Sequence, residues 1–177
     1  FKEITKSNSS IIDIKLKPSD PKPSIKALKA IQSSDAIVIG PGSLYTSIIP
    51  NLLVSEIIEE INKTNNPVIY ICNIATQLGE TTDYNAVSHL ETIQKIIPKL
   101  KITSILVNSR IENLGEAFPT SECVKPGNLN STNIQVKYSD LMNINFKGHH
   151  DPDKLSSAIF EILKNWYNWL LSIIQKE

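Results

Sequence analysis

The sequence offers little with which to hold an anion by charge. Its 177 residues carry 18 basic and 18 acidic side chains, so the formal net charge is zero. This balance leaves no electrostatic footprint for nucleic acid or for an anionic membrane surface. Arg110 is the only arginine, so a bidentate arginine clamp on phosphate is nearly unavailable within this chain. Backbone amides, hydroxyl groups or a lysine would have to hold a phosphate group instead.

Further absences exclude several classes of site. The sequence contains neither G-x-G-x-x-G nor G-x-x-x-x-G-K-[ST], the glycine patterns of dinucleotide-binding turns and P-loops. It also lacks a G-x-S-x-G elbow, which makes Ser43 a poor candidate for an acyl nucleophile. The cysteines and histidines do not have the spacing of a zinc site, and no cluster of carboxylates identifies a site for a divalent cation.

Cysteine is scarce, and no apolar run is long enough for a membrane span. Cys72 ends an apolar segment, as is typical of a buried thiol, and lies far from Cys123 in the sequence. A reducing, cytoplasmic compartment fits this usage best. The most apolar tail, residues 159–174, is interrupted by Glu161 and Lys164 and is too short and too polar to cross a bilayer.

What the sequence does contain is an alternation of strand and helix signals. A wholly apolar run, typical of a strand buried on both faces of a parallel sheet, occurs at 36–39, and the segments 68–72 and 102–107 are predicted to be further buried strands. Runs that alternate apolar and polar residues, typical of half-exposed or edge strands, occur at 11–16 and 134–138. Helical periodicity covers 24–31, 54–63, 86–97 and 152–173. The repeated β-α-β pattern predicts an α/β fold with a doubly wound, mainly parallel sheet and helices on both faces.

Two segments leave alternatives open. Residues 109–132 are rich in Gly, Pro, Asn and Ser, and we expect them to form a long surface excursion. Trp166 and Trp169 lie on or near the apolar face of the last predicted helix. Packing in the core would explain both tryptophans, and so would an interface between subunits of a homo-oligomer.

The first loop of unusual composition is Gly40-Pro41-Gly42-Ser43, which follows the strand predicted at 36–39. In parallel sheets ligands bind outside the carboxyl ends of the strands, and a helix that begins there directs backbone N–H groups at one point. Phosphate or another anion is the expected ligand of such a point. The two glycines could instead serve only a tight turn. Hydroxyl side chains crowd the same turn and favour function: Ser43, Tyr45, Thr46 and Ser47.

The second unusual loop comes one α/β unit later and follows the strand predicted at 68–72. It gathers hydrogen-bonding side chains around Gly79, which permits a close backbone approach: Asn73, Thr76, Gln77, Glu80 and Thr81. Capping of the next helix by Thr81, Thr82 or Asp83 is the alternative. Capping needs one residue, however, and explains neither Asn73 nor Gln77. We therefore predict that residues 40–46 and 73–77 meet in one crevice that accepts a negatively charged metabolite.

The dipeptide His150-Asp151 precedes the last predicted helix, with His149 beside it. A His–Asp pair could orient a base, bind a metal or lie near phosphate. Equally, Asp151 could cap the helix that Pro152 opens, next to a surface histidine. His89 lies in the middle of a predicted helix, where we expect a partly buried or exposed position.

Together these motifs resemble a family of bacterial proteins. The run GPGSLYTSIIPNLL at 40–53, the second loop and His150-Asp151 are similar to the gluconeogenesis factor family of the 2-phospho-L-lactate transferase-like superfamily. The resemblance extends over residues 11–163. It implies a Rossmann-like domain in the cytoplasm that binds UDP-activated sugars and links cell shape and cell-wall precursor metabolism to growth on gluconeogenic carbon sources. Relatives in the superfamily transfer a phospholactyl group from a dinucleotide-like donor to a deazaflavin, with magnesium.

The resemblance also implies roles for individual residues, but names no catalytic residue and no metal ligand. Ligand or phosphate binding is carried onto Gly40, Gly42, Ser43, Tyr45, Thr46, Asn73, Thr76 and Gln77. Further candidates are Gly79, Glu80, Thr81, His150 and Asp151. Ala75 and Leu78 stand where the family usually has Met and Pro.

A glycine-rich Gly-Gly-Gly-Thr-Gly turn, amino-terminal in the family, does not occur in this sequence. We therefore expect residues 1–177 to be the carboxyl-terminal portion of a single Rossmann-like domain. The expected function is a UDP-sugar-binding regulator. The alternative is an enzyme of the 2-phospho-L-lactate transferase type, with Mg²⁺ as its cofactor.

Overall fold

The fold is built on one parallel sheet, seen in a computed structural model that describes residues 11–130 and 132–175. Its strands are β1 (Ile37–Ile39), β2 (Val68–Ile71), β3 (Ser104–Asn108) and β4 (Gln135–Ser139). They lie in the order β1-β2-β3-β4, and every neighbouring pair is parallel. The strands predicted at 36–39, 68–72 and 102–107 are thus confirmed, and β4 is the predicted edge strand. Burial on both faces is confirmed for β2 and β3 but is wrong for β1, which lies at the other end of the strand order and leaves Val38 43% exposed.

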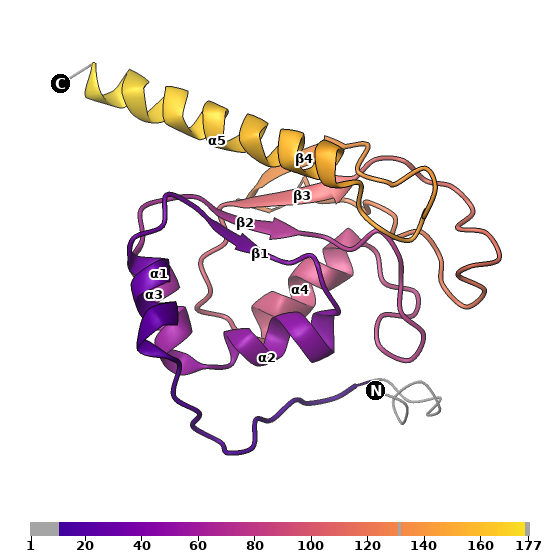
Figure 1. Cartoon of the computed structure of the whole chain (residues 1–177), viewed down its shortest axis with the longest axis horizontal. Helices are drawn as coiled ribbons and strands as arrows, with labels where there is room; N and C mark the ends of the chain where they lie inside the picture. The colour runs from indigo at the N-terminus through magenta and orange to yellow at the C-terminus, as the bar shows by residue number, and fades with distance from the viewer. Residues whose placement is uncertain (1–10, 131, 176–177) are drawn as a thin grey trace.

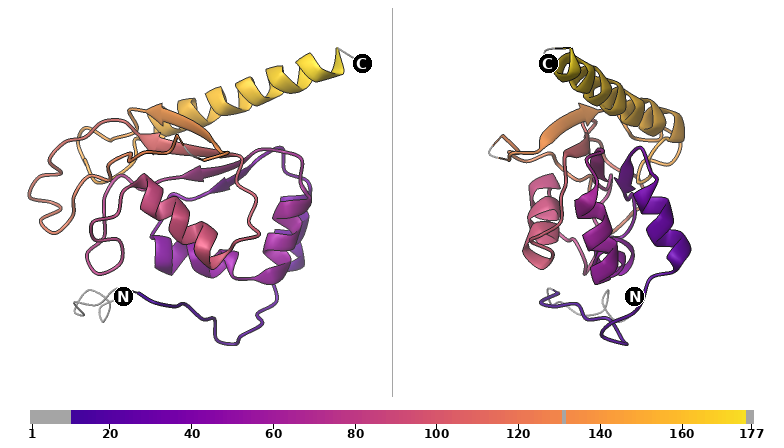
Figure 2. Two further views of the ribbon diagram at one scale, coloured as in Figure 1. Left: turned by 180° about the vertical axis from the view of Figure 1, so that it is seen from behind. Right: turned by 90° about the vertical axis from the view of Figure 1, so that its left-hand side faces the viewer.

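Helices cover both faces of this sheet. On one face lie α1 (Ile25–Gln32), α2 (Ile49–Leu52), α3 (Ser55–Lys63) and α4 (Ala86–Ile96), together with a π-helical turn, η2 (Leu44–Ile48), which runs directly into α2. The long α5 (Pro152–Ile174) crosses the opposite face (Figures 1 and 2). This is the predicted α/β architecture, and it brings the loops that follow β1 and β2 to the same edge of the sheet.

Alternate side chains of the strands build two separate cores. Tyr70 of β2 and Ile105 of β3 pack with the helices of the first face, whereas Ile71 and Leu106 pack under α5. Because every residue of β2 is buried, both of its faces are covered, as its unbroken apolar sequence indicates. The helices contribute apolar residues at helical spacing, among them Ile58, Ile61, Leu90, Ile93, Ala158 and Ile162.

Two predictions about irregular segments are wrong. Residues 11–16 form no strand: Ile12 is 96% exposed, while Ile11 and Ile14 pack against the first core. Alternation creates a face for burial, but a strand also needs a neighbouring strand to bond. Residues 109–130 have no helix or regular strand, yet they are not merely a surface excursion, since Leu114, Val124 and Leu129 are buried.

Helix α5 is packed over only part of its length. Ala158 and Ile162 are its buried residues, and its carboxyl-terminal half extends beyond the sheet (Figure 1). Trp169 is 58% exposed, so core packing is the wrong alternative for this residue. In the part of the chain that the structure describes, no helix combines the length and apolarity needed to cross a membrane.

His89 is fully buried in α4, contrary to the expectation of a partly buried or exposed position. Its Nδ1 lies 2.9 Å from the carbonyl oxygen of Asn85 and must donate to it, because a carbonyl can only accept. Its Nε2 is buried without a partner among the described residues. Protonation would therefore place an unpaired charge in the core, and burial lowers the pKa of His89.

The stability of the protein is expected to fall as the pH drops through the ordinary pKa of histidine. The folded-state pKa of His89 lies below the model-peptide value of 6.5, so the unfolded chain binds the proton first. The contribution is fully present above 6.5 and decreases below it, by up to about 1.4 kcal/mol per pH unit. Urea denaturation at pH 7.5 and 5.5 should show a steeper loss for wild type than for His89→Gln. Exposed His149→Gln is the control and should keep the wild-type slope; equal slopes in all three proteins would contradict the assignment.

Candidate functional site

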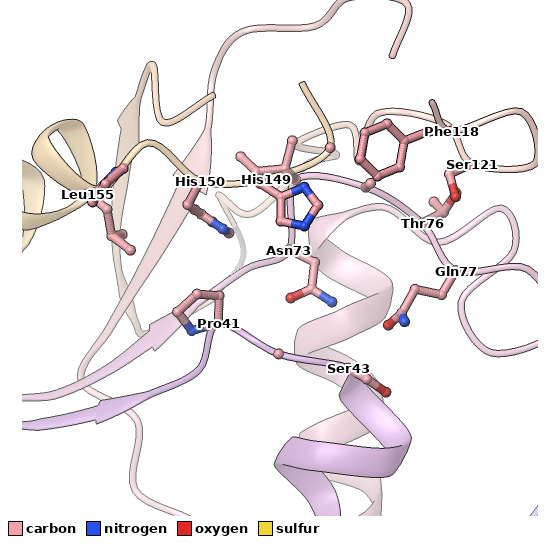
Figure 3. Close-up of a pocket in the computed structure, with 15 residues that line it drawn as sticks. Pro41, Ser43, Asn73, Thr76, Gln77, Phe118, Ser121, His149, His150 and Leu155 are labelled. Carbon is pink, nitrogen blue, oxygen red and sulfur yellow. The ribbon is translucent and has the colours of Figure 1, made fainter. Parts of the chain in front are cut away.

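A cavity of about 620 Å³ opens at the carboxyl ends of β1 and β2 (Figure 3). Four segments line it: the loop after β1, the loop after β2, the irregular segment near Phe118, and the start of α5. Its lining residues are Pro41, Gly42, Ser43, Asn73, Ile74, Ala75, Thr76, Gln77, Phe118, Ser121, Gly148, His149, His150, Pro152 and Leu155. The two loops singled out in the sequence therefore face one crevice, with the residues before α5 on its opposite side.

The first loop contributes Gly42 and Ser43 to the cavity, whereas Gly40 lies just outside its lining. Gly40 has φ +90°, and a Cβ at this position would lie 3.1 Å from the Ile71 carbonyl oxygen in β2. Only glycine fits this turn without displacing its neighbours. Gly40 therefore sets the direction in which the chain leaves β1 toward the cavity.

The Ser43 hydroxyl joins the first loop to the second. It donates to Oε2 of Glu80, 37 residues later, at 2.6 Å. It also accepts from the backbone N–H of Thr46 at 3.1 Å, and from the Thr46 hydroxyl. A hydroxyl offers one hydrogen and two lone pairs, so that of Ser43 is fully used. Glu80 is only 5% exposed and lies behind Ser43, outside the cavity lining.

Tyr45 and Thr46 lie outside the cavity lining. Tyr45 is buried in the first core, and its hydroxyl oxygen is 2.8 Å from that of Tyr84. Burial, together with the Tyr84 hydroxyl, raises the pKa of Tyr45. Thr46 is exposed and contacts Ser43. Both residues shape the turn rather than face the crevice.

The second loop directs Asn73 and Gln77 into the cavity (Figure 3). The Asn73 amide has no hydrogen bond to any described residue, and Oε1 of Gln77 is buried without a partner. Thr76 is held more firmly: its N–H donates to the carbonyl of Glu122 at 2.8 Å, and its hydroxyl accepts from the Glu122 N–H at 2.9 Å. Thr76 thereby fixes the irregular segment that carries Phe118 and Ser121.

The threonines of this loop do not cap α4. Thr81 is buried, and its hydroxyl accepts from the Gln77 N–H at 2.9 Å, while that of Thr82 accepts from the Gly79 N–H at 3.0 Å. The cap is Asn85, whose side chain accepts from the Ser88 N–H. The capping alternative for Thr81, Thr82 and Asp83 is therefore wrong. Gly79, with φ +80°, forms the turn and stays outside the cavity lining, as does Thr81.

His150 and Asp151 do not act as a pair. Asp151 caps α5, since its carboxylate accepts from the N–H groups of Asp153 and Lys154, each at 3.1 Å. His150 is half-buried rather than on the surface, and its Nε2 lies 3.2 Å from the carbonyl oxygen of Cys72. Burial lowers the pKa of His150. The capping alternative is correct for Asp151, and the surface position is wrong for His150.

The charges of the lining decide what chemistry it can support. No Lys, Arg, Asp or Glu occurs among the described residues that line the cavity. Cys72 is fully buried, which raises the pKa of its thiol to about 12 and leaves it protonated at neutral pH. Across residues 11–130 and 132–175, no group of three or more His, Cys, Asp or Glu side chains could hold a metal ion. These residues by themselves do not form a magnesium site. What they offer is neutral donors and acceptors between apolar walls.

Three lining residues have no local sequence signal: Phe118, Ser121 and Gly148. Phe118 forms an aromatic cluster with Phe146 and His149, with ring centroids 5.7 and 5.5 Å apart. Phe118 and Ser121 reach the cavity because Thr76 bonds Glu122 across 46 positions. Such a long-range contact is invisible to periodicity.

Comparison with known proteins identifies the family. The family model described as 2-phospho-L-lactate transferase CofD matches residues 2–142. The gluconeogenesis factor of Listeria monocytogenes is 33% identical over 157 residues, covering 86% of this chain and 49% of that protein. The gluconeogenesis factor of Bacillus subtilis is 34% identical over 158 residues, covering 84% of this chain and 49% of that protein.

A solved structure gives the same assignment. A protein member of the UPF0052 family from Bacillus halodurans is similar to this chain with a TM-score of 0.81 and 34% identity, covering 90% of this chain and 53% of that one. This chain thus spans about half the length of the relatives it matches. Sequence and structure together show that the chain has a Rossmann-like α/β fold and belongs to the gluconeogenesis factor family of the 2-phospho-L-lactate transferase-like superfamily.

Proposed function

We propose that this protein is a cytoplasmic UDP-sugar-binding regulator that links central carbon metabolism to cell-wall synthesis and cell shape. One observation carries the proposal. Two polar strand-exit loops and the residues before α5 enclose a cavity of about 620 Å³, a volume suited to a small-molecule ligand. The gluconeogenesis factors that the chain resembles supply the metabolic context.

The lining suits a ligand rich in neutral hydrogen-bonding groups. The side chains of Asn73, Gln77 and Ser121 offer donors and acceptors that a base or a sugar can meet, and Phe118 offers an apolar face. For the diphosphate, backbone N–H groups are available at Gly42 and Ser43, which line the cavity. Neither of these two is bonded to another described residue. Amides of this kind can hold phosphate oxygens without a cationic side chain.

Several features favour binding over catalysis. The Ser43 hydroxyl donates to the Glu80 carboxyl, which is a base within reach, but it also accepts from the N–H and the hydroxyl of Thr46, so no lone pair is left with which to attack a ligand. Cys72 is buried and protonated, and His150 is not oriented by Asp151. The described part of the cavity thus presents polar groups but no assembled acid–base pair.

Removing a polar group that faces the cavity is expected to weaken binding. Titration calorimetry of the full-length protein with UDP-N-acetylglucosamine should give heat, and Gln77→Ala should lower the affinity roughly tenfold, as expected for the loss of a buried hydrogen bond. Gln94→Ala, an exposed position on α4, is the matched control and should bind like wild type. Absence of heat with wild type at near-millimolar ligand would contradict the proposed function.

The second candidate is a transferase of the 2-phospho-L-lactate type, favoured by the family model that matches residues 2–142. Fold and family alone do not assign chemistry. Full-length protein mixed with magnesium, a deazaflavin and a phospholactyl dinucleotide donor separates the two candidates. Only the transferase predicts a phospholactylated deazaflavin and release of the nucleotide.

A further inference from the structure

A hydrogen bond to the backbone just after β2 holds His150 in one tautomer. Its Nε2 lies 3.2 Å from the Cys72 carbonyl oxygen, which can only accept, so Nε2 carries the hydrogen. In the neutral ring Nδ1 then carries a lone pair. The orientation of His150 in the cavity thus fixes not only where its ring lies but also which kind of group it can meet.

Nδ1 of His150 is free to accept a hydrogen bond. It makes no hydrogen bond with any described residue and is not fully buried, and His150 is one of the residues that line the cavity. In Figure 3, His149 and His150 lie on one side of Asn73, and Pro41 and Ser43 on the other. The two ends of the cavity therefore carry different chemistry.

The end formed by α5 is not an anion site, although a helix begins there. Pro152 has no N–H, and the next two N–H groups, of Asp153 and Lys154, are already taken by the Asp151 carboxylate. The N–H of Leu155 donates to the Asp151 carbonyl. Because the first N–H groups of α5 are occupied and the Asp151 carboxylate is negatively charged, the start of this helix repels phosphate rather than attracting it. The unbonded amides of Gly42 and Ser43 are at the other end.

We propose that Nδ1 of His150 accepts a hydrogen bond from a sugar hydroxyl of the ligand, which places the sugar against the start of α5 and the diphosphate against the backbone of Gly42 and Ser43. The assignment rests on the proposed function and adds the orientation of the ligand in the cavity. Burial keeps the imidazole neutral at pH 7.5, consistent with its lowered pKa. A neutral nitrogen lone pair attracts a hydroxyl hydrogen and repels a phosphate oxygen.

The test pairs a protein variant with altered ligands. In full-length protein, His150→Phe keeps a ring but removes both nitrogens, and should lower the affinity for UDP-N-acetylglucosamine roughly tenfold. A UDP-N-acetylglucosamine analogue that lacks the contacted hydroxyl should bind wild type more weakly than UDP-N-acetylglucosamine does, by about the same factor. His150→Phe should bind the analogue and UDP-N-acetylglucosamine equally, as a double-mutant cycle requires for one shared bond. UDP serves as the third ligand. Unchanged UDP affinity in His150→Phe assigns the hydroxyl to the hexose, and a tenfold loss assigns it to the ribose.

His150→Gln is the rescue variant, because its amide can donate to the Cys72 carbonyl and still accept, and it should bind more tightly than His150→Phe. Gln94→Ala, at an exposed position on α4 away from the cavity lining, is the control and should bind like wild type. Thermal melts identify any variant that has failed to fold, and ¹⁵N NMR of wild type at pH 7.5 reads the tautomer directly. A hydrogen on Nδ1, or equal affinity of wild type and His150→Phe for every ligand, would overturn this assignment alone. Wild type that binds no UDP-sugar would overturn the proposed function, and the assignment with it.

Discussion

Gly40→Ala is expected to lower the free energy of unfolding by about 3 kcal/mol. Gly40 has φ +90°, a backbone conformation that costs a residue with a Cβ about 1–2 kcal/mol. The added Cβ would also lie 3.1 Å from the carbonyl oxygen of Ile71 and 3.3 Å from Cδ1 of Ile48. The carbonyl belongs to β2 at the centre of the sheet, so the loop rather than the strand must shift. Urea denaturation at pH 7.5 measures the loss.

Two other glycines separate the causes of this effect. Gly115 has φ +80° with no atom within 4 Å of an added Cβ, so Gly115→Ala should cost only the backbone term, about 1–2 kcal/mol. Gly42 does not have a positive φ, and its Cβ would meet Ser47 at 3.4 Å, an ordinary contact, so Gly42→Ala should change stability little. If Gly40→Ala costs no more than Gly115→Ala, the close approach to Ile71 is not the reason for glycine at position 40.

The fold was predictable where burial alone dictates pattern. A strand covered on both faces must be apolar at every position, and β2, with all of its residues buried, is apolar throughout. Ile58 and Ile61 of α3 repeat at helical spacing because one face of that helix packs on the sheet. Residues 11–16 alternate equally well, yet their partner strand does not exist among the described residues. Pairing is a long-range property, and local alternation cannot report it.

The candidate site was predictable where chain topology alone places a residue. Asn73 and Gln77 line the cavity because they follow β2 at the carboxyl edge of a parallel sheet. Tyr45 follows β1 in the same way, but helical rotation turns its side chain into the core, where it meets Tyr84. Phe118 reaches the cavity through an irregular segment whose path depends on single hydrogen bonds. Composition predicts which loops take part, but not which side chains face inward.

Ser43→Ala is expected to lower the free energy of unfolding by about 3 kcal/mol, through the partner it leaves behind. The Ser43 hydroxyl is the only donor that the described residues give to the Glu80 carboxyl, at 2.6 Å, and the other oxygen of Glu80 is buried without a partner. Truncation leaves both oxygens of this 5%-exposed group without a donor, which costs more than the lost bond is worth. The N–H of Thr46 also loses its acceptor. Urea denaturation measures the loss.

The sharper test is that a second substitution should restore stability. In Ser43→Ala/Glu80→Leu the orphaned carboxyl is gone, and replacing both partners of a buried hydrogen bond with apolar groups is close to neutral. The double variant should therefore be more stable than Ser43→Ala alone, by about 1–3 kcal/mol, and Thr46→Ala, at an exposed position, should differ little from wild type. Losses that simply add would show that Ser43 and Glu80 are not coupled. The bond between Ser43 and Glu80 joins the loop after β1 to the loop after β2. A double variant that regains stability but still binds UDP-N-acetylglucosamine weakly would therefore separate two roles of Ser43. Its bond to Glu80 would account for stability, and the shape of the first loop would account for affinity.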